Sequence, residues 1–170
     1  MNSENATIHE RITVDLSEKQ DDVVLFLIGM RINSWWKPWR WIPVAIAMRR
    51  MLRELSQNPE SGLLATRGGG PGVMVQYWSS FEALANYASD RSGQHYPAWA
   101  AFNRALAKSG DVGIWHETFL VPASNIEAVY NHMPPTGLAS YLPRVPATGH
   151  KKTARQRIKQ QEGEQRKQAA

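Results

Sequence analysis

Hydrophobic residues recur along this chain with two different periods, and the order in which the periods alternate constrains the fold more than any other feature. Short β-branched and aromatic runs predict strands, whereas apolar residues spaced three and four apart predict helices. The strand-like segments are 23–33, 63–66, 73–78 and 112–121, and the helix-like segments begin at Pro43, Ser79 and Pro97. This β-α-β-β-α-β order, with its second helix in two pieces, predicts an α+β fold of the ferredoxin-like type.

The same order predicts an oligomer. An antiparallel sheet with helices on one face must have its other face covered, and a second copy of the chain covers it most simply. We therefore expect a homodimer, with the two sheets facing each other.

Four segments divide the chain by composition. Residues 1–21 form a polar, loosely held arm in which 11–16 could be a short edge strand, and residues 22–133 form the α+β domain, in which 126–130 could add a fifth strand. Residues 134–147 are rich in Pro and are expected to wrap the surface without regular structure. Residues 148–170 form a basic tail without an apolar face, which predicts disorder or a frayed helix.

The basic charge of the chain is concentrated in that tail. The net charge is +5, but residues 144–170 hold eight Lys and Arg against two Glu, while the rest holds 12 basic and 13 acidic residues. The body of the protein therefore has no electrostatic reason to bind nucleic acid, and the tail would give only a weak, salt-dependent attachment.

The absence of cysteine excludes whole classes of chemistry. Disulfides, thiolate nucleophiles, Cys-ligated zinc and iron–sulfur clusters all need this residue. The histidines show no metal-ligand spacing. The longest strongly apolar run, 23–30, is far shorter than the roughly 20 residues of a membrane helix. The sequence also begins without a secretory signal, so we expect a cytoplasmic protein without a membrane partner.

Polar residues end the first predicted strand. Alternation places Arg31 and Asn33 on one side of the strand together with Leu27 and Gly29. This face either borders a polar-tipped pocket or emerges into solvent.

Four tryptophans follow within seven residues: Trp35, Trp36, Trp39 and Trp41. They could plug the core, form an aromatic wall or lid over a flat ligand, or contact a second copy of the chain. Insertion into a membrane surface would need an amphipathic helix, which the sequence does not predict at this point.

The positions of two histidines bear on whether they could take part in a functional site. His95 follows a helix-breaking stretch, from which it could reach a cavity as a base, a hydrogen-bond donor or a haem ligand, or lie in a surface loop. His116 lies in the last strand beside Glu117, and neighbours on a strand point to opposite faces, so the two cannot share a metal.

Four phrases of the sequence carry a family resemblance: VVLFLIGMRIN (23–33), VMVQYWSSFEALANYASD (73–90), HYPAWAAFNR (95–104) and SGDVGIWHETFLVP (109–122). They resemble a family labelled monooxygenase-like after a fumagillin-pathway monooxygenase. That family is similar to the antibiotic-biosynthesis monooxygenases of the dimeric α+β barrel superfamily. The resemblance covers about residues 22–135.

The resemblance implies a cavity between each sheet and its own helices. Cofactor-independent oxygenases of the superfamily bind flat aromatic or polyketide-like compounds there, and haem-degrading relatives bind haem through a histidine. An Asn on the first strand, an indole on the second helix and a following His recur as pocket residues. Asn33, Tyr87 and His95 correspond to these positions, with Tyr in place of Trp.

These considerations assign roles to specific side chains. Asn33 would hold a substrate carbonyl or a peroxide, His95 would accept a proton, and Arg31 would stabilise an enolate or phenolate. The residues expected to contact the substrate are Tyr87, Trp78, Trp35, Trp36, Trp99 and His116.

The leading functional hypothesis is a monooxygenase-like oxidoreductase that acts on a small hydrophobic, aromatic or polyketide-like compound and requires no cofactor. The resemblance thus favours an enzyme. One alternative is a haem-binding or haem-processing protein of the same fold, with His95 as the iron ligand. Another is a non-catalytic ligand-binding module, because this fold hosts many functions.

Overall fold

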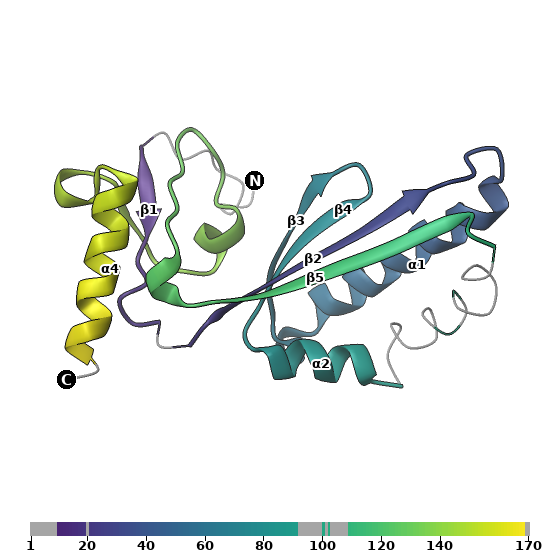
Figure 1. Cartoon of the computed structure of the whole chain (residues 1–170), viewed down its shortest axis with the longest axis horizontal. Coiled ribbons are helices and arrows are strands. Elements are labelled where there is room, and N and C mark those ends of the chain that lie inside the picture. The colour runs from purple at the N-terminus through teal and green to yellow at the C-terminus, as the bar shows by residue number, and fades with distance from the viewer. Residues whose placement is uncertain (1–9, 20, 92–99, 101, 103–108, 169–170) are drawn as a thin grey trace. The chain divides into compact units, whose positions relative to one another are not determined.

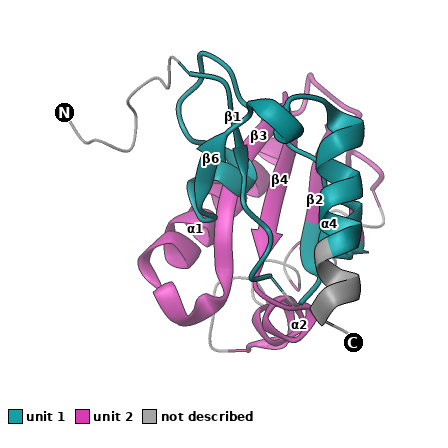
Figure 2. Ribbon diagram, turned by 90° about the vertical axis from the view of Figure 1, so that its left-hand side faces the viewer, with its two compact units in different colours: residues 1–25, 119–170 teal, residues 26–118 magenta. Residues whose placement is uncertain are grey.

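The structure, a computed structural model, describes residues 10–19, 21–91, 100, 102 and 109–168. The chain divides into two compact units, residues 26–118 and residues 1–25 together with 119–170 (Figure 2). Among the described residues, no helix is both long enough and apolar enough to cross a bilayer.

A four-stranded sheet has the strand order β3-β4-β2-β5 (Figure 1). Its strands are β2 (Val23–Ile32), β3 (Leu63–Gly70), β4 (Val73–Trp78) and β5 (Val112–Val121). Strand β2, the first of these four in the chain, lies between β4 and β5, the last two. This is the order that a split β-α-β unit produces. The predicted ferredoxin-like α+β fold is therefore confirmed.

Strands β3 and β4 form an antiparallel hairpin, with Thr66 opposite Gln76 and Gly68 opposite Met74. The glycine-rich stretch lengthens β3 beyond its predicted end, and the turn shrinks to Pro71 and Gly72. Gly72 has a φ of 73°, a conformation that side chains other than glycine rarely adopt.

Helix α1 (Pro38–Gln57) begins five residues before the predicted start at Pro43 and lies on one face of the sheet (Figure 1). Pro38 occupies the first turn, where its fixed φ suits a helix and its missing N–H is not needed. Pro43 lies inside the helix, where its missing N–H cannot donate to the carbonyl four residues earlier.

Helix α2 (Phe81–Ser89) begins two residues after Ser79, the predicted start. The cap is Ser80, whose hydroxyl accepts a hydrogen bond of 3.0 Å from the Ala83 N–H. The core below this helix holds the side chains of Gln76, Trp78 and Leu84. Trp78 is 1% exposed, and its indole N–H donates to Gln76 Oε1 at 3.0 Å.

The second unit contains two short paired strands. One lies within 11–16, where the sequence allowed a short edge strand, and the other lies in 134–147, which was expected to have no regular structure. Strand β1 (Ile12–Val14) pairs antiparallel with β6 (Arg144–Pro146). Ile12, Val14 and Leu16 are buried, so this part of the arm is packed rather than loosely held. Short 3₁₀ turns lie at Pro59–Ser61, Ala123–Asn125, Gly137–Ser140 and Gly149–Lys151.

The possible fifth strand does not form. Residues 126–129 are irregular, and Tyr130 makes an isolated bridge with Ile12. The two residues exchange backbone hydrogen bonds of 3.0 and 2.9 Å, which satisfies both backbones without a strand.

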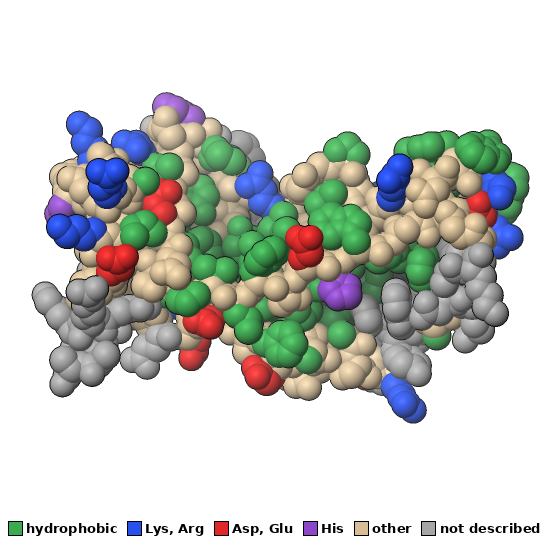
Figure 3. All heavy atoms as spheres, in the orientation of Figure 1, with side chains coloured by type: hydrophobic (Ala, Val, Ile, Leu, Met, Phe, Trp, Pro, Cys, Tyr) green, Lys and Arg blue, Asp and Glu red, His purple; other side chains and the backbone are tan. Residues whose placement is uncertain are grey.

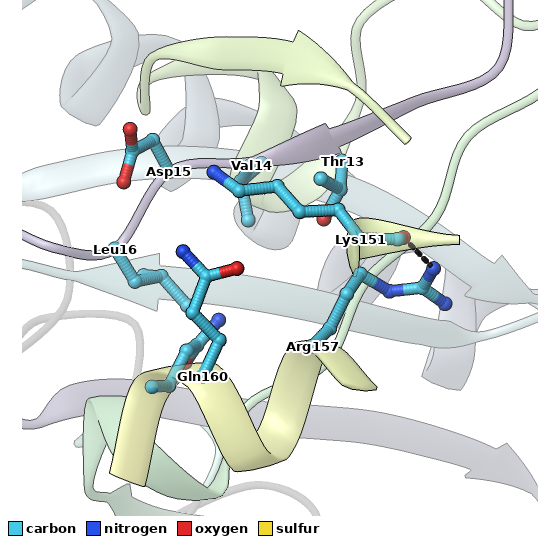
Figure 4. Close-up of a pocket in the computed structure, with 8 residues that line it drawn as sticks. Thr13, Val14, Asp15, Leu16, Lys151, Arg157 and Gln160 are labelled. Atoms are coloured by element: carbon cyan, nitrogen blue, oxygen red, sulfur yellow. Dashed lines mark hydrogen bonds between the residues drawn. The ribbon is translucent and has the colours of Figure 1, made fainter. Parts of the chain in front are cut away.

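The basic tail forms helix α4 (Ala154–Gln168), which corrects the expectation of disorder. Its anchor is Arg157, which is 4% exposed and forms an ion pair with Glu127. The same guanidinium donates to the Lys151 carbonyl at 2.7 Å (Figure 4). A buried, fully paired arginine thus replaces the apolar face that the tail lacks.

Candidate functional site

Strands β2 and β5 meet where a tryptophan side chain lies across a glycine. A Cβ added to Gly29 would come within 2.3 Å of Nε1 and 2.5 Å of Cε2 of Trp115, so the indole lies directly against the β2 backbone. Trp115 is nevertheless 39% exposed. The indole therefore offers a flat, partly open apolar surface to a ligand.

Polar groups continue the same face. Alternation along β2 puts Arg31 on the side of Gly29, and a Cβ on Gly113 would lie 3.9 Å from both Arg31 Cβ and Asn33 Nδ2. We call the group formed by Gly29, Arg31, Asn33, Gly113 and Trp115 the β2–β5 patch. It combines an indole, a guanidinium and an amide. The space above Gly29 is filled by the indole, whereas a Cβ on Gly113 would have no neighbour closer than 3.9 Å.

The amide of Asn33 is oriented by the backbone. Its Nδ2 donates a hydrogen bond of 2.8 Å to the Gly110 carbonyl, an acceptor that fixes which end of the amide is nitrogen. One N–H and the carbonyl oxygen of this amide make no hydrogen bond to any described residue. Asn33 can therefore both accept from a hydroxyl and donate to an oxyanion.

Arg31 is exposed and forms no ion pair within the described parts of the chain. An unpaired guanidinium is a strong donor to any negative charge that comes within reach. Beside Asn33 it provides the positive charge of the β2–β5 patch.

Asp111 holds the end of β2 in place. Its backbone carbonyl accepts from the N–H groups of Asn33 at 2.9 Å and Ser34 at 3.2 Å. Its carboxylate accepts from the Ser34 hydroxyl at 2.7 Å and from Lys37 Nζ at 2.8 Å. Arg40 adds an ion pair, with 3.7 Å between its Nε and the second carboxylate oxygen.

These donors stabilise the charged form of Asp111. The hydrogen bonds from Lys37 and then Ser34 lower the pKa of its carboxyl below the ordinary value of 3.8. The carboxylate therefore stays ionised at neutral pH and links the end of β2 to the start of α1.

Trp78 and Tyr87, both expected to contact a substrate, pack against each other. Their ring centroids are 5.6 Å apart, and Trp78 is fully enclosed. Burial, followed by the charges of Glu54 and Asp90, raises the pKa of the Tyr87 phenol well above its usual value. Tyr87 is therefore a neutral phenol at physiological pH, and it cannot act as a base there.

His116 lies apart from the β2–β5 patch. It is the neighbour of Trp115 on β5 and so points to the other face of the sheet. There its ring lies 5.6 Å from that of Phe26. The structure therefore does not bring His116 together with Arg31 and Asn33.

The remaining expected contact residues are distributed differently. Trp35 and Trp36 are 66% and 71% exposed, and the Trp35 ring meets the edge of Trp41 at 5.8 Å. His95 and Trp99 lie outside the described residues.

Trp115 is a residue that the sequence reasoning missed. The signal was present, because a glycine inside a strand often marks the close approach of another group. The alternation on β5 then allows either Trp115 or His116 to be that group, and only the pairing of the strands distinguishes them.

In the part of the chain that the structure describes, a metal site is missing and the pocket beside β1 is too small for a substrate. Among the described residues, no cluster of three His, Asp or Glu side chains could hold a metal ion. A pocket between β1 and α4, lined by Thr13, Asp15, Lys151 and Arg157 among others, has a volume of about 10 Å³ (Figure 4). This volume suits one water molecule, not a substrate.

Comparisons with known proteins assign the fold to a family. The sequence has no significant match among curated proteins. One similar solved structure is SnoaB, a cofactor-independent oxygenase from Streptomyces nogalater, with 12% sequence identity and a TM-score of 0.40. The similarity covers 59% of this chain and 93% of SnoaB. The model of the family described as Monooxygenase af470-like matches residues 23–138, which include the β2–β5 patch and both described helices of unit 26–118. The predicted resemblance is thereby confirmed, and the chain belongs to the monooxygenase af470-like family.

Proposed function

We propose that this protein is a monooxygenase that oxidises a small hydrophobic compound, aromatic or polyketide-like, at the β2–β5 patch. The match to the monooxygenase af470-like family over residues 23–138 carries the proposal. The unpaired guanidinium of Arg31 beside the oriented amide of Asn33 supports it, because both groups suit a substrate that becomes an anion.

The proposed reaction uses O₂ and the electrons of the substrate itself, without a bound cofactor. An acidic CH₂ group beside a carbonyl or an aromatic ring loses a proton to a base. The carbanion then adds O₂ to give a hydroperoxide, and loss of water leaves a carbonyl group. One oxygen atom ends in the product and the other in water.

Each group of the patch has a task in this scheme. The indole of Trp115 offers its exposed face to the flat substrate. The guanidinium of Arg31 stabilises the enolate or phenolate, and the free N–H of Asn33 donates to the same oxygen or to the peroxide. His95 is the proposed base, since an imidazole titrates near neutral pH.

Trp78 and Tyr87 contribute shape rather than proton transfer. The indole N–H of Trp78 is already bonded to Gln76, and Tyr87 remains a neutral phenol. They keep α2 at a fixed distance from β4.

A homodimer is part of the proposal. The sheet has α1 on one face, and a second sheet would shield the opposite face from water. Size-exclusion chromatography with light scattering should give twice the mass of the chain. A monomer at micromolar concentration would contradict this part alone.

Oxygen consumption tests the enzymatic proposal. Purified protein is incubated with anthrone-type and hydroquinone compounds in an oxygen electrode, and products are identified by mass spectrometry. Wild type should transfer one atom of ¹⁸O₂ to the product. Arg31→Gln should lower kcat by about a hundredfold, as the loss of one anion-stabilising donor does elsewhere.

The matched control is Arg67→Gln, which removes an exposed arginine from β3 and should leave turnover unchanged. His95→Ala should abolish the acidic limb of the pH profile. A Soret band in the spectrum of the purified protein would favour the haem alternative. Equal turnover of Arg31→Gln and wild type would refute the role of the patch.

A further inference from the structure

The start of α1 exposes large apolar side chains that no described element covers. Trp35, Trp36 and Trp39 are 66%, 71% and 66% exposed, and Ile42 and Ile46 are 41% and 47% exposed. Figure 3 shows hydrophobic side chains gathered at the end of the molecule where β2 leads into α1. Soluble monomers rarely expose so many large apolar groups together, and such patches mark interaction sites.

Three of these side chains share one side of the helix. Trp39, Ile42 and Ile46 follow at intervals of three and four residues, so they lie above one another on α1. This arrangement exists because the helix begins at Pro38 rather than at Pro43. The amphipathic helix that the sequence did not predict here is therefore present.

The same side of α1 becomes cationic toward its C-terminal half. Arg49, Arg50 and Arg53 continue the three- and four-residue spacing after Ile46, and all three are exposed. None of them forms an ion pair with a described residue. By contrast, Lys37 and Arg40 near the tryptophans are paired with Asp111.

We propose that this surface docks the protein onto an anionic lipid bilayer. We call it the Trp–Arg face, and it consists of the helical residues Trp39, Ile42, Ile46, Arg49, Arg50 and Arg53, with the exposed Trp35 and Trp36 directly before the helix. Indoles prefer the headgroup level of a bilayer, and arginines are attracted by anionic headgroups. An amphipathic helix lying in that plane buries its apolar side about 5–10 Å deep.

Charge complementarity favours a bilayer over a second copy of the chain. A symmetric dimer would use this same face on both copies, so each set of arginines would have to find its partner there. The face contains no acidic residue. An anionic bilayer supplies both the apolar layer for the indoles and the negative charge for the arginines. The proposal does not depend on the enzymatic function proposed above.

Vesicle sedimentation tests the proposal. The full chain is mixed with vesicles of phosphatidylcholine and phosphatidylglycerol at a 70:30 ratio, or with phosphatidylcholine alone, at low and high salt. Binding should require the anionic lipid and weaken with salt. Replacing Trp35, Trp36 and Trp39 together with Ser should reduce the partition coefficient at least tenfold. A double variant, Leu64→Ser with Phe81→Ser, removes exposed apolar side chains elsewhere in unit 26–118 and should bind normally.

The basic tail could also attract anionic vesicles, so it needs its own control. Changing Arg49, Arg50 and Arg53 to Gln should weaken binding by about a hundredfold at low salt, about fivefold for each arginine. Changing the exposed Lys152, Arg155 and Lys159 to Gln removes the same charge from the tail region and should have a much smaller effect.

Quenching of tryptophan fluorescence by brominated lipids shows which part inserts. Wild type should be quenched, and the Trp35, Trp36 and Trp39 variant should not, with circular dichroism confirming that each variant folds. Equal losses from the two charge variants would overturn the proposal, as would unchanged binding of the tryptophan variant. The proposal would also be refuted if wild type did not bind vesicles and the tryptophan variant changed only the oligomeric mass, because a second copy of the chain would then occupy the face.

Discussion

The contact between Gly29 and Trp115 predicts that Gly29→Ala changes the free energy of unfolding in opposite directions with and without the Trp115 indole. A methyl group at Gly29 would lie 2.3–2.7 Å from three atoms of the indole. Carbon atoms in normal contact are about 3.5–4.0 Å apart, so the ring would have to move by roughly 1 Å. Gly29→Ala therefore forces the indole away from β2 or distorts the sheet.

Two opposing effects set the magnitude. Overpacking of this kind typically costs about 1–3 kcal/mol. Alanine in a strand is about 0.5–1 kcal/mol better than glycine, because glycine loses more backbone entropy on folding. Gly29→Ala should thus lower the free energy of unfolding by about 0.5–2 kcal/mol in wild type. Once Trp115→Ala has removed the ring, the same change should raise it by about 0.5–1 kcal/mol.

Urea denaturation followed by circular dichroism measures the four unfolding free energies of this double-mutant cycle. The coupling between the two positions should be about 1–3 kcal/mol. For a chain of this size each kcal/mol also shifts Tm by about 2–4 °C, which gives an independent measurement. If Gly29→Ala had the same effect with and without Trp115, the indole would not lie against β2, and the β2–β5 patch would lose its apolar member.

Three further changes test other parts of the structure. Asp111→Asn should destabilise the fold at neutral pH; because the pKa of Asp111 is lowered on folding, wild type loses this contribution as pH falls below the ordinary value of 3.8, and the urea midpoints of the two proteins should approach each other over that range. Arg157→Met should cost about 3 kcal/mol, since it strands Glu127 without its cation, and hydrogen exchange should show α4 losing protection first; unchanged exchange would contradict the anchoring role. Tyr87→Phe should leave the absorbance titration at 295 nm unchanged up to about pH 11, because burial keeps this phenol neutral; one missing phenolate in that range would refute its burial.

The architecture was predictable because it depends on local periodicity. Alternation and three- or four-residue spacing gave the elements of unit 26–118 in their correct order, and the strand order follows from that sequence of elements. Element starts were less predictable. Two prolines, Pro38 and Pro43, are equally suited to a first helical turn, and the residue before Pro38, Lys37, pairs with Asp111, which lies far away in the sequence.

The tail shows a different limit of sequence reasoning. Residues 148–170 lack an apolar face, and the rule that such a segment does not pack is sound for solvated side chains. Arg157 is an exception to this rule because Glu127 and two backbone carbonyls accept hydrogen bonds from its guanidinium. Glu127, thirty residues away in the chain, provides the contact that lets this segment pack, and no local sequence pattern indicates the pairing.

The candidate site was predictable to the extent that it depends on alternation. Arg31 and Asn33 were expected on one face with Gly29, and the structure places them so. The choice of His116 over Trp115 could not be made from β5 alone, because its two faces carry aromatic residues of similar character. His95 and Trp99 remain predictions, as does weak binding of nucleic acid by the tail.

Asp111 connects the two surfaces for which functions are proposed. Its backbone carbonyl holds Asn33 at the end of the β2–β5 patch, and its carboxylate holds Lys37 and Arg40 at the start of the Trp–Arg face. These anchors lie within eight residues of one another along the chain, and all of them bond to the same residue, Asp111. A small hydrophobic substrate dissolves in bilayers, and a patch held rigidly beside a bilayer-docking helix would meet it where its concentration is highest. Because the Asp111 carboxylate pairs with both Lys37 and Arg40 and offsets one of their two positive charges, the tryptophan end of α1 is less cationic than the half that carries Arg49, Arg50 and Arg53. The unpaired arginines further along the helix are then left to select the anionic lipid.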